Sequence, residues 1–409
     1  MSAKPPAVPI FKGRDFYVPA FEVKIGPAGS PGAGKPLPKE TLRDIMEVRY
    51  VDTVGQFDTF ELTVNNWDAL KRDFKYTGPA KGTSDPTRRE QLFDPGQEVE
   101  LWMGYFKPPK GGQGALRLML TGVITKVAPS FPAAGVPTLK VSGVNSLARL
   151  IKKQETHVYK EKLRDSDIAM EVDKRGNLTF NNVKIPVETN KEARAKEPEH
   201  PDKVTQKNQY DVLFLLQLAH RNGYDLVLRG EEKNGQYKQS LYFGPSTQKP
   251  PQTFLVEWGK SLVQFNPTMK TMKQVNELTV CGWDAMKKEE IKVTVSRKDL
   301  DTKGLKDEER LYRIEQGFSE KAEVVVDRPF RNAAEAKTFA LGQLSDISKN
   351  LVTTHGSTLG TTGIRAGQKI EVQGVGRTFN GPYFITSSTH VIGAGGYLTE
   401  FDARLEVPK

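Results

Sequence analysis

The chain has 409 residues, a formal net charge of +10 and a single cysteine, Cys281. This length accommodates roughly two to four domains with cores of their own. One cysteine excludes an internal disulfide framework and a cysteine-based structural zinc site. No apolar run reaches the roughly 18 residues of a membrane-spanning helix, and the N-terminus lacks the apolar core of a signal peptide. We therefore expect assembly in the cytoplasm.

The positive charge raises the question of nucleic acid, but it is spread along the chain. Lysine and arginine alternate with acids, as in residues 192–197 and 287–290. Binding to a phosphate backbone needs basic residues gathered on one surface. A solvated surface that faces acidic partner proteins is the favoured interpretation, and sequence-specific nucleic-acid binding is the minor one.

The first part of the chain predicts an antiparallel β-barrel or sandwich over residues 15–152, preceded by an N-terminal arm at 1–14. Apolar and polar residues alternate at 21–25, 46–50 and 60–64, which is the period of half-buried strands. Glycine and asparagine between these runs indicate hairpin turns.

A short phrase occurs twice in the chain. Gly96-Gln97-Glu98-Val99-Glu100 stands in the first quarter, and Gly367-Gln368-Lys369-Ile370-Glu371 stands near the C-terminus. Each is followed by a strand that begins with glycine, at Gly122 in the first copy and at Gly381, just before Tyr383, in the second. The repetition predicts two similar β-units in one chain, whose strands at 96–144 and 367–403 should superpose.

The middle of the chain, residues 153–250, predicts a small α+β module. An apolar helix runs from Tyr210 to Asn222, where Gly223 favours a left-handed end. Two predicted strands follow, at 224–228 and 240–243.

The last part, residues 251–409, predicts a second β-barrel. It opens with the strand around Trp258-Gly259, and a later strand, which ends at Gly282-Trp283, resembles one in the first barrel. A long linker at 298–310 precedes an amphipathic helix at 332–349, whose apolar residues form one stripe.

The sequence offers no active site. Gly29 to Lys35 has the spacing of a phosphate-binding loop, but Pro31 removes an N–H and Pro36 replaces the hydroxyl that would hold magnesium. The five histidines lack metal-ligand spacing, and His390 in mid-strand favours a structural role. We expect no cofactor, no metal and no enzymatic activity.

The motifs resemble a known family. The stretches 256–262 and 278–284, the helix from Tyr210 and the terminal 366–385 together are similar to the phage late control gene D family, the hub proteins of contractile-tail baseplates. That family is similar to the N-terminal hub part of type VI secretion spike proteins. The resemblance covers most of residues 150–409 and, more weakly, the first barrel.

The resemblance implies a fold and a function. Such hubs are trimers in which each chain contributes two tail-tube-like barrels, and the resulting pseudo-hexameric ring joins a sixfold inner tube to a threefold spike. Partners would be two further copies, an inner tube protein, a spike protein and baseplate wedge or adaptor proteins. The chain ends at Lys409 without an oligonucleotide-fold domain or a needle, so we expect the spike to be a separate polypeptide. We expect barrel edges to carry the contacts with neighbouring chains.

The expected repeat and interface residues combine both copies of the phrase with two tryptophan–glycine pairs. They are Gly96, Gln97, Glu98, Gly122, Trp258, Gly259, Gly282, Trp283, Gly367, Gln368, Gly381 and Tyr383. For Trp102, Trp258 and Trp283 a place in the core is the favoured reading, because tryptophans in strands are usually buried. A particle-associated cell-wall hydrolase and a basic nucleic-acid-binding protein are the alternative functions.

Overall fold

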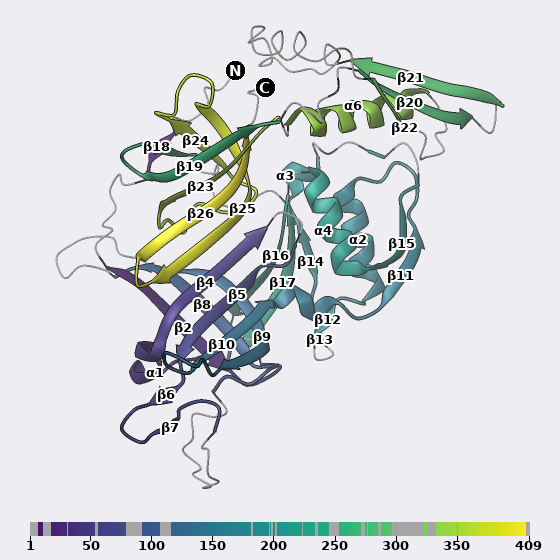
Figure 1. The fold of residues 1–409 in the computed structure, drawn as a ribbon. Helices are drawn as coiled ribbons and strands as arrows, with labels where there is room; N and C mark the ends of the chain where they lie inside the picture. The colour runs from purple at the N-terminus through teal and green to yellow at the C-terminus, as the bar shows by residue number, and fades with distance from the viewer. Residues whose placement is uncertain are drawn as a thin grey trace.

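The fold is that of a computed structural model, which is mainly β (Figure 1). It describes residues 7–10, 18–30, 32–53, 56–78, 92–106, 116–180, 183–195, 197, 199–200, 203–222, 224–233, 236–244, 253–270, 275, 277–284, 288–296, 299, 322–325, 333–349 and 351–405. Most of the expected N-terminal arm and nearly all of the linker at 298–310 lie outside these residues.

Six strands make up what we call the N-terminal unit, in the spatial order β2-β8-β9-β10-β5-β4. The strands are β2 (Pro19–Gly26), β4 (Ile45–Thr53), β5 (Thr59–Asn65), β8 (Glu98–Tyr105), β9 (Leu116–Ser130) and β10 (Thr138–Asn145). Their alternation buries one face. In β5, for example, Phe60, Leu62 and Val64 point into the core.

Six further strands make up the C-terminal unit, in the order β18-β24-β25-β26-β23-β19. The strands are β18 (Phe254–Glu257), β19 (Leu262–Met269), β23 (Val352–Leu359), β24 (Lys369–Gln373), β25 (Gly381–Gly393) and β26 (Gly396–Leu405). They enclose a second core that includes Val256, Tyr383 and Phe401.

The two units have the same topology. Strands taken in chain order occupy the same places in the two spatial orders, so that β2, β4, β5, β8, β9 and β10 correspond to β18, β19, β23, β24, β25 and β26. One difference is that β2 pairs with β8 antiparallel, whereas β18 pairs with β24 parallel. The duplication therefore extends from a short phrase to six strands.

The units are joined through β4, which pairs with β25 from Thr53↔Ser387 to Val48↔Ile392. With the short β1 (Val8–Pro9) and β3 (Lys35–Pro36), they form one 14-stranded mixed sheet (Figure 1). The expectation of a mainly β chain is confirmed, but the pairing of the described strands closes no barrel. The physical reason is that the end strands of each unit do not pair with each other, since β4 pairs with β25 of the other unit and β19 pairs only with β23 among the described strands.

Small elements decorate the N-terminal unit. The helix α1 (Lys39–Asp44) precedes β4, and the strands β6 (Trp67–Asp68) and β7 (Asp73–Phe74) form a two-stranded hairpin. The 3₁₀ helix η2 (Ser146–Leu150) follows β10, and Asn145 at its start makes no side-chain cap.

The middle of the chain folds around its own apolar core. Its helices are α2 (Asp165–Arg175), α3 (Lys191–Arg194) and α4 (Asp211–Asn222). Its strands are β11 (Gln154–Val158), β12 (Thr179–Phe180), β13 (Val183–Lys184), β14 (Val187–Thr189), β15 (Thr205–Tyr210), β16 (Asp225–Lys233) and β17 (Gln236–Gly244). The predicted α+β character is present.

A second small module lies between β19 and β23 in the chain. The strands β20 (Glu277–Asp284), β21 (Glu289–Ser296) and β22 (Ala322–Val325) form a separate sheet, against which α6 (Ala333–Lys349) packs. Leu278 and Val280 form a core with Ala336, Ala340 and Leu344. The expectation that the strand ending at Gly282-Trp283 belongs to the second barrel is therefore wrong.

Candidate functional site

The repeated phrase builds the same turn in both units. The N–H of Gln97 donates to the carbonyl of Asp94 at 3.2 Å, and the N–H of Gln368 donates to the carbonyl of Arg365 at 3.2 Å. The third residue of each turn is a glycine with a left-handed φ, +93° at Gly96 and +83° at Gly367. A turn that needs a positive φ at its third position favours glycine there.

Each turn is then fastened to the long strand of its unit by the same two bonds. The N–H of Gly96 donates to the carbonyl of Ile124 at 2.7 Å, and the N–H of Ile124 donates to the carbonyl of Gln97 at 3.0 Å. In the C-terminal unit, Gly367, Ile385 and Gln368 repeat both bonds at 2.9 Å. Ile124 and Ile385 are therefore equivalent positions.

This equivalence corrects the alignment of the two glycine-led strands. Gly122 lies opposite Val99, and the residue in the matching place, opposite Ile370, is Tyr383. Gly381 lies two residues earlier, with φ +138°. Gly122 is needed because a Cβ there would come within 2.3 Å of the carbonyl of Val144.

A bulge follows the equivalent isoleucines in both units. The register shifts at Thr125 in β9 and at Thr386 in β25. The Thr125 hydroxyl donates to the carbonyl of Ser142 at 3.4 Å, and the Thr386 hydroxyl donates to the carbonyl of Asp402 at 3.0 Å. The units therefore share even the device that bends their long strands.

The other predicted residues are spread over three places. Glu98 is buried beside Arg149, to which it is ion-paired, and burial raises its pKa. Trp258 and Gly259, which has φ +78°, form the exposed turn between β18 and β19. Gly282 and Trp283 lie in the separate small sheet.

The expectation that the tryptophans lie in the core is not met. Trp258 is 54% exposed and Trp283 is 56% exposed, so neither is a core residue. Trp102 is half-buried under Lys24, whose Nζ lies 5.1 Å from the ring centroid. The structure thus does not gather the predicted residues into one site.

The site that the structure does build is the junction of β4 and β25. At its centre lies Asp52, whose side chain is 7% exposed. Its carboxylate accepts from Nε of Arg365 at 2.5 Å, from the N–H of Ala366 at 3.3 Å and from the Ser388 hydroxyl. The second phrase thus reaches, through its own turn, into the N-terminal unit.

A second set of bonds continues from this carboxylate into the C-terminal unit. His390 is fully buried, and its Nε2 lies 3.0 Å from the carbonyl of Ile364. A carbonyl only accepts, so Nε2 carries the hydrogen and Nδ1 accepts from the Tyr397 hydroxyl at 2.9 Å or from that of Thr399 at 3.1 Å. The bonding suits a neutral imidazole.

Burial sets the protonation of the groups around the junction. It lowers the pKa of His390 to about 4 and raises the pKa of Tyr50 well above its ordinary value. Burial and repulsion by Asp52 raise the pKa of Asp58 to about 6, against the attraction of Arg365. The Asp58 side chain is 28% exposed, so solvent moderates this last effect.

Sequence reasoning missed this network. Asp52 and Arg365 are 313 positions apart, so the sequence does not indicate that they meet. The available signal was polar residues at inward positions of alternating strands, namely Asp52 in β4 and Ser388 and His390 in β25.

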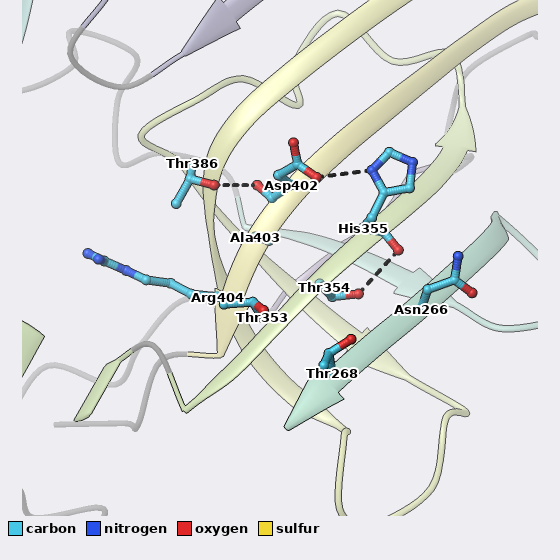
Figure 2. A pocket seen from close by; sticks show the side chains of 9 residues that line it. All are labelled: Asn266, Thr268, Thr353, Thr354, His355, Thr386, Asp402, Ala403 and Arg404. Atoms are coloured by element: carbon cyan, nitrogen blue, oxygen red, sulfur yellow. Dashed lines mark hydrogen bonds and ion pairs between the residues drawn. The ribbon is translucent and has the colours of Figure 1, made fainter. Parts of the chain in front are cut away.

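A groove of about 500 Å³ lies on the outer face of the C-terminal unit (Figure 2). Its lining residues are Asn266, Thr268, Thr353, Thr354, His355, Thr386, Asp402, Ala403 and Arg404. The exposed His355 is paired with Asp402 at 3.0 Å, and the Thr354 hydroxyl donates to the carbonyl of His355 at 3.3 Å. Among the described residues, no group of three or more His, Cys, Asp or Glu side chains could hold a metal ion. None of the helices in the described parts of the chain has the length and apolar character to cross a membrane.

Comparison with known proteins places the chain in a family. The family described as the Alg8 N-terminal domain matches residues 78–394. A comparison with curated proteins found no match.

Solved structures of tail proteins share the fold. The tail protein from Neisseria meningitidis MC58 is 14% identical with a TM-score of 0.58, and the match covers 95% of this chain and 97% of that one. The 43 kDa tail protein of prophage MuSo2 from Shewanella oneidensis is 14% identical, with a TM-score of 0.57 and coverage of 94% and 98%. A chain in the Francisella PdpA–VgrG complex is 11% identical, with a TM-score of 0.55 over 96% of this chain and 59% of that one.

Proposed function

We propose that this chain, which belongs to the family described as the Alg8 N-terminal domain, is a structural baseplate hub of a contractile tail or tail-like injection particle. Three copies form a ring of six similar units, which adapts a sixfold inner tube to a threefold spike. The ring assembles in the cytoplasm and then becomes part of the particle. It works as a scaffold and catalyses no reaction.

The observation that carries the proposal is the duplication inside the chain. Two units with the same strand order, turn and bulge present similar but non-identical surfaces. A threefold assembly of such chains presents six similar faces on one side and keeps a true threefold axis for the other. The shared fold of the tail proteins supports the same reading. We propose the two units as tube-like domains, with the middle of the chain as the part that projects from the ring.

Mass measurement of the purified chain under native conditions tests the proposal. We expect a species of three times the chain mass that contains no other component. Electron microscopy of that species should show a ring with six lobes. A chain that stays monomeric at every concentration, or that forms an open polymer, would contradict the proposal.

A further inference from the structure

The internal junction leaves two matching edges open. It uses β4 of the N-terminal unit and the second half of β25 of the C-terminal unit. The equivalent of β4 is β19, which pairs only with β23 among the described strands. The equivalent half of β25 is residues 125–130 of β9, which pair only with β10 in the described part of the chain.

The internal junction supplies a register for these edges. Because Ile124 and Ile385 are equivalent, each β25 residue has a counterpart in β9. The pairing of β4 with β5 and of β19 with β23 likewise assigns each β4 residue a counterpart in β19. Transferred in this way, the pairs Val48↔Ile392, Tyr50↔His390 and Asp52↔Ser388 become Phe265↔Phe131, Pro267↔Pro129 and Met269↔Val127.

The residues on the open edges differ from their counterparts in polarity. Where the internal junction has the polar Asp52 and Ser388, the open edges have the apolar Met269 and Val127. Met269 and Val127 are partly exposed, although each also packs on the core of its own unit. Phe131 on the β9 side is 59% exposed. Half-exposed apolar side chains along a strand edge indicate a surface that another protein covers.

Both open edges carry a proline at the centre. Pro267 occupies the place of Tyr50, and Pro129 occupies the place of His390. A proline has no N–H and is tolerated where the strand edge is free. The central pair therefore loses its two hydrogen bonds, which protects each edge from indiscriminate strand pairing. A partner must then be recognised mainly through its side chains.

The transferred register sets two lysines opposite each other. Lys270 takes the place of Thr53 and Lys126 takes the place of Ser387, which are paired in the internal junction. Both side chains are exposed, so solvent screens most of their repulsion. The pair therefore weakens the contact slightly and provides a probe of the register.

We propose that the open edge of β19 in one copy docks on residues 125–131 of the next copy, in the register in which β4 docks on β25. This inference rests on the proposed function and names the surface by which the ring closes. Because the two edges differ, the contact is head-to-tail, and it closes when the rotation per copy is one third of a turn.

Disulfide trapping tests the register. The pair Val51↔Thr389 of the internal junction transfers to Thr268↔Ala128. Because this pair is next to the proline pair, it occupies a non-hydrogen-bonded position, where the two strands lie closer together. Its Cα atoms should lie about 4.5 Å apart, within the range of a disulfide. In a Cys281→Ser background, the double variant Thr268→Cys with Ala128→Cys should oxidise to covalent trimers. Each single variant is a control, and so is Thr268→Cys with Ser130→Cys, which is two residues out of register.

The outcomes separate the two proposals. Covalent trimers from the in-register pair alone support the docking. A native trimer without cross-linking, or equal cross-linking of the shifted pair, overturns the docking but leaves the hub function standing. A chain that never exceeds the monomer mass overturns both.

A charge change provides a second measurement without cysteines. Lys126→Glu turns the like-charge pair with Lys270 into an opposite-charge pair and should lower the dissociation constant of the trimer up to about fivefold, as for an exposed ion pair. Adding Lys270→Glu should abolish that gain. If the effects of the two variants simply multiply, Lys126 and Lys270 do not meet and the register is wrong.

Discussion

The internal junction and the open edges occupy equivalent places in the two units but have opposite chemistry. The junction is polar and charged, with the Asp52 carboxylate satisfied by Arg365, Ala366 and Ser388. The open edges carry proline, methionine and valine in the matching places. A buried charge is tolerable where its partner belongs to the same chain and is always present. On an edge that waits for a second molecule, prolines prevent indiscriminate strand pairing, and an apolar side chain avoids the cost of a charge left without its partner.

The largest effect should come from breaking the buried ion pair. Asp52→Ala removes the acceptor of three donors and takes that partner from Arg365, whose side chain is 24% exposed. The free energy of unfolding should fall by about 4 kcal/mol. Urea titration followed by tryptophan fluorescence measures the loss. The matched control is Met269→Ala, at the equivalent place on the open edge. Since Met269 is only partly buried, that variant should lose about 1–2 kcal/mol. Equal losses would show that the two places are energetically alike.

The sequence predicted part of this architecture. The repeated Gly-Gln phrase predicted the duplication, because a left-handed turn restricts its third position to glycine. The register between the copies was wrong by two residues, because the glycines at 122 and 381 serve different needs. Gly122 avoids a clash with a carbonyl, whereas Gly381 has a positive φ.

The partners of each strand were not predictable in the same way. Alternation specifies which face of a strand is buried but not which strand lies beside it. The strand at 277–284 alternates like any other and yet joins a separate sheet with α6. For the same reason, the sequence predicted closed barrels, whereas β25 divides its pairing between two units.

A second contrast concerns how tightly β10 and β26 pack in their units. Gly143 is equivalent to Ala403, since they lie opposite Ile124 and Ile385. A Cβ on Gly143 would come within 2.1 Å of the Val123 carbonyl and 2.4 Å of the Phe60 ring. Gly143→Ala should therefore cost about 3 kcal/mol of unfolding free energy. In the C-terminal unit, Thr354 stands where Phe60 stands, so the ring contact is absent there.

The reverse exchange is the control for that experiment. Ala403→Gly removes one methyl group from a strand interior and should cost only about 1 kcal/mol. Calorimetry of both variants gives the comparison. A Gly143→Ala protein as stable as the native chain would mean that the N-terminal unit is looser than its contacts indicate.

The junction should also respond to acid in a way that the open edges do not. His390 has a pKa of about 4 when buried, below its ordinary value of 6.5. A lowered histidine pKa contributes stability that is complete above pH 6.5 and is lost as the pH falls to 4. The loss should amount to about 3 kcal/mol. Replacing His390 by Gln should flatten the pH dependence across that window, measured as the difference between the two proteins.

The titration of Asp58 changes the stability with pH in the opposite direction, but it does not affect the difference between the native chain and the His390→Gln protein. Its pKa is raised to about 6, so its contribution is complete below its ordinary value and is lost as the pH rises through 6. Both proteins retain it. An unchanged slope in the His390→Gln protein would show that the imidazole is not held neutral by the junction.

The smallest effect tests where the two units are alike rather than where they differ. Gly96 and Gly367 have φ of +93° and +83°, and a Cβ would meet only Ala28 at 3.8 Å in the first case and nothing within 4 Å in the second. Alanine should therefore cost about 1 kcal/mol at either position, from the left-handed backbone alone. Gly395→Ala is the control, because Gly395 has equal space and no left-handed φ, and it should be nearly neutral. If the losses at 96 and 367 differ by more than about 1 kcal/mol, packing around the turns has diverged, since backbone conformation alone predicts equal values.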